Sequence, residues 1–535
     1  MGQSMSNVSE YEFLVFLVLA IFVLELLARR ARLPPAGAFI LGGIALALVP
    51  GAPALTIDPD LILLVFMPPL LMHGAYFTVW REFRANLTGI LLLAFGAVAF
   101  TTLLVGLAAH WLVPALPWAV CFTLGAIVSP PDAVAAGAVL ERLALPGRIS
   151  ALLQGESLLN DASGLVLFRL ALTAALTGSF SAPAAFGALC LLSAGGVAVG
   201  FVVGHAGLLV LRRLRDSELT ITATLLLAVA SYIVGDRLHV SGVLSTVTAG
   251  LVLGWHQHEI ISAATRVRAQ AFWKVMVFLL ESILFILIGL SLRGVLERVD
   301  THPQALRALA APVAGVVGAL IVSRFLWIFG TDLLHRGARR FGRMRQAEPS
   351  FATATLLSWA GMRGVVTLAA ALSLPVSLPG RDIVLICAFA VILVTVLLQA
   401  PTLAPLIRLL RVSGASELIL RRDSEDLAWL RMAQAQHARI AALSHQPDGT
   451  ERHPRLLEQY GHRVRVAAAY RADRDAHEPR RIDHFNAIIA AIAAGRLAVL
   501  RMHRAGEIDD RVLRTLEYEL DLQQMAAESQ TEDEA

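Results

Sequence analysis

The chain has 535 residues, of which 56% are hydrophobic and 16% are charged, and its mean hydropathy is +0.67. This composition excludes a soluble globular protein of this length and indicates a polytopic membrane protein. The small net charge of +4 gives no reason to expect a nucleic-acid partner, and the three cysteines lie in separate apolar runs without the spacing of a disulfide framework or a zinc site.

Apolar runs of about 20 residues predict thirteen transmembrane helices in an all-α fold. Acidic Glu10 and Glu12 precede the first run, so we expect a retained span and not a cleaved signal peptide. The predicted spans cover residues 11–28, 34–50, 60–79, 88–112, 118–140, 151–176, 184–211, 218–235, 238–255, 271–292, 308–334, 350–374 and 382–407.

Basic residues predict the orientation of these spans, because they collect on the cytoplasmic side of a membrane. The loops that follow odd-numbered spans hold seventeen arginines, whereas the alternate loops hold five. We therefore expect a multi-pass protein of the plasma (inner) membrane, with its N-terminus outside and its C-terminus in the cytoplasm.

Two predicted spans are interrupted near their middles. The fifth contains SPPD at residues 129–132, and the twelfth contains GMRG at residues 361–364. Tandem prolines stop a helix from continuing, and paired glycines unwind it or admit a close neighbour. Since the breaks lie seven spans apart, they indicate inverted repeats, spans one to six and eight to thirteen. Broken helices of this kind are typical of a transport site near the membrane midplane.

The sixth span carries a polar stripe in an otherwise apolar run. Glu156 and Asn160 share one helix face by their i,i+4 spacing, and Ser157 and Asp161 share the adjacent face. Asp161 falls near the middle of the span, where an ionised carboxylate is costly. A single polar residue there could be a packing residue with satisfied hydrogen bonds, but four within six positions indicate a functional site.

The chain changes character after the thirteenth span. Residues 413–535 hold 17 Arg, 21 Asp and Glu, and seven of the fifteen His, with helical patterning and no membrane-length apolar run. Around residues 506–510 the pattern predicts a helix, a short turn and a second helix. We therefore divide the chain into a transmembrane domain, residues 1–411, and a soluble helical cytoplasmic tail, residues 412–535, for packing or dimer contact.

Five motifs lie along the membrane region: MPPLL at 67–71, SPPDAV at 129–134, GESLLND at 155–161, VSGV at 240–243 and GMRG at 361–364. Together they resemble the monovalent cation:proton antiporter family that includes the NhaP antiporters and the animal sodium–proton exchangers. The resemblance covers essentially the whole membrane region, and the tail string AGEIDDRVLRTLEYELDL resembles the tails of bacterial members. It implies a thirteen-helix fold with a mobile core domain and a dimerisation domain, exchanging Na⁺ for H⁺ by an elevator-type movement. The broken fifth and twelfth helices would cross.

The resemblance also implies roles for the polar stripe. Asp161 would be the carboxylate that binds either ion, Ser157 a coordinating hydroxyl, and Asn160 the amide that steadies the broken helices. No cofactor is implied beyond the transported Na⁺ and H⁺. The implied partners are monovalent cations, protons, the lipid bilayer and a second copy of the chain in a homodimer.

Buried charges complete the implied site. Glu156 and Asp132 would be partners of the buried Arg363, which agrees with the need of a buried guanidinium for nearby carboxylates. Glu281 and Arg324 also lie deep in predicted spans, and we expect them to form a structural pair or to be satisfied by backbone.

The sequence departs from the family pattern at two positions. His73 stands where many members carry an acid after the third-span Pro-Pro motif, and Pro131 stands where many have Thr before the fifth-span Asp. Only the Pro131 carbonyl could then coordinate an ion. His73 remains a candidate ligand that could also add a protonation switch.

Other functions remain open at this point. The chain could be a K⁺/H⁺ antiporter or a sodium-coupled solute symporter, since symporters also use broken helices. An intramembrane aspartyl protease using Asp132 and Asp161 is less consistent with the pattern, because alternating access needs a broken helix in each half and proteolysis does not. Electroneutral exchange of one Na⁺ for one H⁺ is expected, because Asn160, and not a second acid, precedes Asp161.

Overall fold

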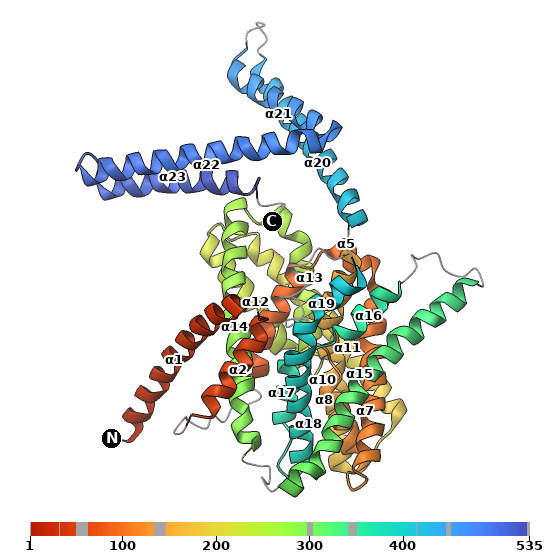
Figure 1. Cartoon of the computed structure of the whole chain (residues 1–535). Helices are drawn as coiled ribbons and strands as arrows, with labels where there is room; N and C mark the ends of the chain where they lie inside the picture. Colours follow the sequence, from red (N-terminus) through yellow and green to blue (C-terminus); the bar gives the residue numbers. More distant parts are fainter. Residues whose placement is uncertain are drawn as a thin grey trace. The chain divides into compact units, whose positions relative to one another are not determined.

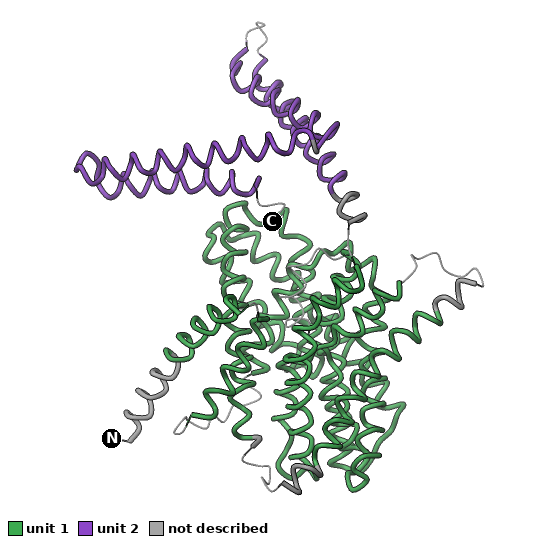
Figure 2. The backbone as a smooth tube through the Cα atoms, viewed as in Figure 1, with its two compact units in different colours: residues 1–414 green, residues 415–535 purple. Residues whose placement is uncertain are grey.

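The computed structural model describes residues 2–31, 33–49, 62–132, 146–296, 303–340, 350–412, 415–445 and 451–531. Nearly all of these residues are helical, and no β-strand occurs in these ranges, so the predicted all-α fold is confirmed for them. They form two compact units, Met1–Gly414 and Ala415–Ala535, coloured separately in Figure 2.

The N-terminal part of the membrane unit contains mostly α-helices, interrupted by two short π-helical segments, η1 and η2. Their bounds are α1 Gly2–Ala31, α2 Pro35–Ala47, η1 Ile62–Phe66, α4 Met67–Tyr76, α5 Trp80–Ala85, α6 Leu87–Leu91, η2 Leu92–Ala97, α7 Val98–Leu112, α8 Trp118–Val128 and α10 Gly147–Thr177. Gly178 adopts a left-handed conformation with φ of 71°, which ends α10.

The rest of the membrane unit follows the same pattern, with a third π-helical segment, η3. The bounds are α11 Ala182–Leu211, α12 Ser217–Arg237, α13 Gly242–Ile260, α14 Ala263–Leu296, α15 Pro303–Arg340, α16 Phe351–Trp359, α17 Val365–Leu372, α18 Arg381–Val394, η3 Thr395–Gln399 and α19 Ala400–Leu410. Side chains of Asp216, Ser241 and Ser350 accept hydrogen bonds from the first turns of α12, α13 and α16, which fixes where these helices begin.

The predicted spans correspond to helices, with two kinds of difference. The third, fourth and thirteenth spans, predicted as continuous, contain η1, η2 and η3, and hydropathy cannot detect such a change of helical type. The twelfth span is divided into α16 and α17, as the paired glycines predict. In the fifth span α8 ends at Val128, as the Pro-Pro break predicts. Residues 133–140, its second half, lie outside the described residues, as does Val134 of its motif.

The membrane unit contains two helix bundles, each with a core cluster of its own, and a larger cluster of buried residues joins them. The first, which we call the α8 bundle, consists of η2, α7, α8, α10, α15, α17 and α18. The second, which we call the α13 bundle, consists of α2, α4, α11, α12, α13 and α14. Figure 1 shows α2, α12 and α14 on one side of the unit and α7 and α15 on the other. Helix α10 packs mainly on α8 and η2, and more lightly on α11 and α13, so it lies at the seam between the bundles.

Close helix approach within the α13 bundle depends on small residues. Gly43 of α2 and Gly289 of α14 face each other, and a Cβ at either position would overlap a backbone carbonyl of the other helix. Small residues of this kind allow membrane helices to pack backbone against backbone, which gains van der Waals contact where lipid offers no hydrophobic driving force.

The tail unit consists of two helical hairpins. Helices α20 Ala415–Ser444 and α21 Pro454–Ala472 pack together, as do α22 Arg474–Arg504 and α23 Asp510–Glu528. Gly506, with φ of 74°, and the N-cap Asp509 form the turn of the second hairpin, which confirms the predicted helix-turn-helix.

The tail differs from the prediction in one respect. Eight helices in the described residues are long and apolar enough to cross a membrane by length and composition, and one of them is Ala476–Arg504 in α22. The prediction of no membrane-length run in the tail is therefore corrected. The alanine- and isoleucine-rich centre of α22 is apolar, whereas its charged ends suggested a polar segment.

Candidate functional site

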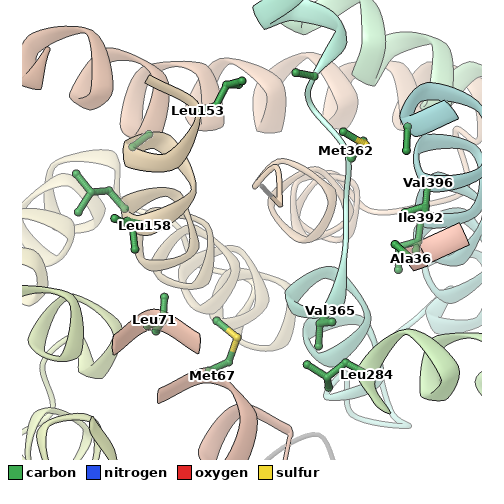
Figure 3. Packing of buried hydrophobic residues seen from close by; sticks show 14 of the residues in the cluster. Ala36, Met67, Leu71, Leu153, Leu158, Leu284, Met362, Val365, Ile392 and Val396 are labelled. Carbon is green, nitrogen blue, oxygen red and sulfur yellow. The ribbon is translucent and has the colours of Figure 1, made fainter. Parts of the chain in front are cut away.

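The two helix breaks meet in the α8 bundle. After α8 ends at Val128, the backbone N–H of Asp132 donates to the carbonyl oxygen of Met362, at 2.7 Å. Met362 belongs to the extended stretch between α16 and α17, which Figure 3 shows running past the labelled Met362 to the helix that contains Val365. This backbone hydrogen bond joins the breaks, and it satisfies groups that the missing helical turns leave without partners.

Gly364 allows the breaks to approach this closely. A Cβ built at Gly364 would overlap the Asp132 carboxylate, so the Asp132 side chain lies directly against the backbone of the second break. A side chain at this position would force the Asp132 carboxylate to move. The GMRG motif therefore has a packing reason for its second glycine.

Arg363 is held by backbone carbonyl groups. Its Nε donates to the carbonyl of Val128 at 2.8 Å, its Nη2 to that of Ser129 at 3.1 Å, and its Nη1 to that of Gly361. Arg363 as a whole is 2% exposed. The carbonyls of residues 128 and 129 are at the C-terminal end of α8, where the helix dipole is negative, so this end partly offsets the buried charge.

The carboxylate of Glu156 pairs with Arg324 and not, as predicted, with Arg363. Arg324 Nη1 and Nη2 donate to Glu156 Oε1 and Oε2 at 2.6 and 2.7 Å, and Arg324 Nε donates to the carbonyl of Leu357 at 3.0 Å. Both side chains are almost fully buried, at 4% and 2% exposed. The correction has a physical cause: Arg363 is satisfied by carbonyls that the breaks release, which leaves Glu156 to the cation of α15.

Arg324 is thus a site residue whose place the sequence did not predict. We expected it to pair with Glu281 or with backbone, and its backbone contact is present, but its carboxylate partner is Glu156, 168 residues away. A signal was present in the sequence. Ser323 and Arg324 form a polar doublet inside an apolar span, and the Ser323 hydroxyl lies 3.0 Å from that of Thr101 in the same bundle.

The polar stripe of α10 faces the first break. The amide of Asn160 donates to the carbonyl of Pro131, which is the contact with a broken helix that the resemblance implies for Asn160. Asn160 is fully buried and Asp161 is 9% exposed. The adjacent Ser163 hydroxyl donates to the carbonyl of Ala94 in η2. Helix α10 is therefore tied to the break on one side and to a π-helical segment on the other.

A small pocket lies between α10 and the first break. Pro131, Asp132 and Ser157 line it together with Glu156 and Arg324. A carbonyl, a hydroxyl and carboxylates are oxygen ligands of the kind that bind hard cations. The structure therefore brings together Ser157, Asp132 and Pro131, and places Asn160 and Asp161 on the same helix.

His73 is located elsewhere. Its ring lies on α4 against Phe77 and Trp273, with ring centroids 4.9 and 6.2 Å away, and so belongs to the α13 bundle. The described lining of the small pocket does not include it. A role for His73 as an ion ligand stays a prediction that this geometry does not favour.

Comparisons with known proteins identify the family and the fold. The profile of the family described as "Sodium/hydrogen exchanger, transmembrane" matches residues 15–409. A solved structure of the sodium proton antiporter MjNhaP1 from Methanocaldococcus jannaschii has the same fold, with a TM-score of 0.57 and 21% identity over 74% of this chain and 97% of that one.

Curated relatives extend the likeness. An uncharacterized Na⁺/H⁺ exchanger of Mycobacterium tuberculosis is 30% identical over 96% of this chain and 95% of its own length. The Na⁺/H⁺ antiporter NhaP of Pseudomonas aeruginosa is 33% identical over 65% of this chain and 81% of its own. A sodium, potassium, lithium and rubidium/H⁺ antiporter of Bacillus pumilus is 32% identical over 68% of this chain and 56% of its own.

Proposed function

Because this chain belongs to the transmembrane sodium/hydrogen exchanger family, we propose that it exchanges Na⁺ for H⁺, with Asp161 as the group that binds either ion. It is a multi-pass membrane protein and a cation:proton antiporter, a transporter and not an enzyme. We propose that it works in the plasma membrane as a secondary active transporter, with its N-terminus outside and its tail in the cytoplasm.

One observation carries the proposal. Asp161 lies on α10 next to Asn160, whose amide binds the first break at Pro131, and that break is bonded to the second at Met362. A carboxylate beside two joined helix breaks can exchange ligands without unfolding a helix, because the backbone there is already free of helical hydrogen bonds.

The stoichiometry follows from the count of acids on this face. Asn160 stands beside Asp161 where a second acid would add a second proton, Glu156 is occupied by Arg324, and the Asp132 carboxylate lies against the backbone at Gly364. A single carboxylate then holds either one Na⁺ or one H⁺ at a time. We propose electroneutral 1:1 exchange by direct competition at Asp161, with the Ser157 hydroxyl and the Pro131 carbonyl as further oxygen ligands.

The two bundles support alternating access. The α8 bundle carries Asp161 and both breaks, and each bundle has a core cluster of its own besides the larger cluster that the two share. We propose that the α8 bundle moves as a body along the α13 bundle, in an elevator-type movement, and that a homodimer holds the α13 bundle in place.

The test is exchange in vesicles that contain the purified protein. A preset pH gradient should dissipate when Na⁺ is added, membrane voltage should leave the rate nearly unchanged, and Asp161→Asn should abolish exchange while the protein remains folded. Exchange retained in Asp161→Asn, or a Na⁺ gradient driven by voltage alone, would contradict the mechanism.

Transport of another alkali cation in place of Na⁺ is a specific alternative. The Bacillus pumilus relative is described as a sodium, potassium, lithium and rubidium/H⁺ antiporter. The same assay with K⁺, Li⁺ and Rb⁺ in turn decides whether Na⁺ is the preferred ion. An organic solute that alters the ion flux would instead indicate a symporter.

A further inference from the structure

A larger pocket lies at the seam between the two bundles. Its volume, which includes space open to the solvent, is about 400 Å³, and it is lined by residues of α10, α11, α12 and the start of α13. The lining residues on which the argument below depends are Ala162, Arg169 and Asp236. The pocket is distinct from the small one beside Asp132, which is lined by other residues.

The pocket extends along α10 from the neighbourhood of Asp161. Ala162, the next residue after Asp161, belongs to its lining, and so does Arg169, two turns further on. Eight residues of α-helix from Asp161 to Arg169 span about 12 Å. The pocket thus lies along the helix between the carboxylate that we assign to ion binding and the end of α10.

Two opposite charges stand at the far end of this pocket. Arg169 Nη2 lies 3.7 Å from Asp236 Oδ1, and the two side chains are 66% and 57% exposed. This is a loose contact between well-hydrated groups, unlike the buried bidentate pair of Glu156 with Arg324. An exposed pair of this kind forms and breaks at little cost.

The pair also links the two bundles. Arg169 is on α10 of the α8 bundle, and Asp236 is near the end of α12 in the α13 bundle. Any movement of α10 along the seam must change the distance between these side chains. A contact that a transport movement necessarily breaks is suited to a gate and unsuited to a permanent structural role.

We infer that the seam pocket is a passage for the transported monovalent cation and that Arg169 and Asp236 form an electrostatic gate at its mouth. Asp236 attracts cations to the mouth, while Arg169 repels them and closes the gate by pairing with Asp236. This inference rests on the proposed function. It assigns to the two residues control of ion access, and leaves binding itself to Asp161. With the orientation proposed above, the mouth faces the outside.

The experiment compares the apparent KM for Na⁺ at each face, using right-side-out and everted vesicles. At the outer face, Arg169→Gln should lower the KM at least about threefold, and Asp236→Asn should raise it by a similar factor, because one charge near the mouth changes the local cation concentration by that order. In the double variant the two changes should largely offset each other. At the inner face the KM should stay unchanged.

Two controls separate a gate from a structural effect. Arg29→Gln removes an exposed arginine that pairs with Glu25 on α1, far along the chain from the pocket, and should leave both KM values unchanged. The KM differences should also shrink at about 1 M choline chloride, where charges are screened within about 3 Å. A structural effect would not respond to salt in this way.

The outcomes distinguish the two proposals. Normal exchange with unchanged outer-face KM in both single variants would overturn the gate and leave the proposed function intact. KM changes at both faces, or changes insensitive to salt, would also overturn it. Absence of cation:proton exchange in the unaltered chain would contradict the proposed function and the gate with it.

Discussion

The Glu156–Arg324 pair of the membrane unit and the Asp426–Arg474 pair of the tail are both ion pairs between helices, but their surroundings differ. The first has two hydrogen bonds of 2.6 and 2.7 Å and is nearly inaccessible to solvent. The second has one contact of 3.3 Å, with side chains 13% and 20% exposed. Loss of one partner therefore strands a charge in the membrane unit, whereas in the tail water can replace it.

The tail pair also has substitutes. Arg474 lies 3.7 Å from Glu478, which in turn contacts Arg481 at 2.8 Å, and both guanidinium groups lie over the ring of Tyr470. Arg324 instead divides its donors between one carboxylate and one backbone carbonyl. The comparison teaches that the number of alternative partners, and not the number of charges, decides how much stability a single substitution removes.

The largest effect is expected for Arg324→Met. The substitution keeps most of the side-chain volume but leaves the Glu156 carboxylate buried without its cation, which should lower the free energy of unfolding by about 3–5 kcal/mol. Denaturant unfolding in detergent, followed by tryptophan fluorescence, measures this change.

A double variant sharpens this prediction. Glu156→Gln combined with Arg324→Met removes both charges and should recover a large part of the lost stability, because no unpaired charge remains. An unchanged free energy of unfolding in Arg324→Met alone would show that water reaches Glu156. The Glu156–Arg324 pair would then not differ from the Asp426–Arg474 pair of the tail.

An intermediate effect is expected for Arg363→Lys. A lysine ammonium cannot donate to the carbonyls of Val128, Ser129 and Gly361 with the planar geometry of a guanidinium, so buried acceptors lose partners. We expect a loss of about 2–3 kcal/mol in unfolding free energy. Arg29→Lys, at an exposed position, is the matched control and should change stability little. Equal stabilities of the two variants would mean that Arg363 contributes only its charge.

The smallest effect, with the opposite sign, is expected for Asp426→Asn. Burial raises the pKa of Asp426, Arg474 opposes this, and Asp423, Glu425 and Glu478 raise the pKa further. The folded tail then binds a proton at Asp426 more tightly than the unfolded chain does. Its stabilising contribution is present below the ordinary pKa of 3.8 and is lost as pH rises through the raised value. Asp426→Asn should therefore stabilise the tail at neutral pH by about 1 kcal/mol or less.

Hydrogen exchange of α20 and α21 in the full-length protein, corrected for the intrinsic pH dependence of exchange, measures this difference. In the unaltered chain the protection should fall as pH rises through the window just above 3.8, and in Asp426→Asn this fall should be absent. Protection that increases with pH in that window would show that Arg474 outweighs burial, as in an ordinary salt bridge.

The sequence predicts local features of this protein better than distant contacts. The break at residues 129–132 could be predicted, because proline acts on its own helix, and the contact of Asn160 with that break followed from the family resemblance. The partner of Glu156 could not be predicted, because two buried arginines at similar depth were available and only the packing of α15 decides between them. The apolar centre of α22 was missed because charged residues at both of its ends dominate the pattern.

Contacts made from the π-helical segments depend on the number of residues in their helices. A π-helical turn holds an extra residue compared with an α-helical one. Deleting one residue within η2 or η3 would replace the wider turn with an α-helical one, so the helix on either side would nearly keep its orientation while the backbone and side-chain groups of the segment itself would shift. The carbonyl of Ala94 would then turn away from Ser163, and the hydroxyl of Thr395 from the backbone N–H of Arg363. These two contacts with the site therefore depend on a single residue in each helix.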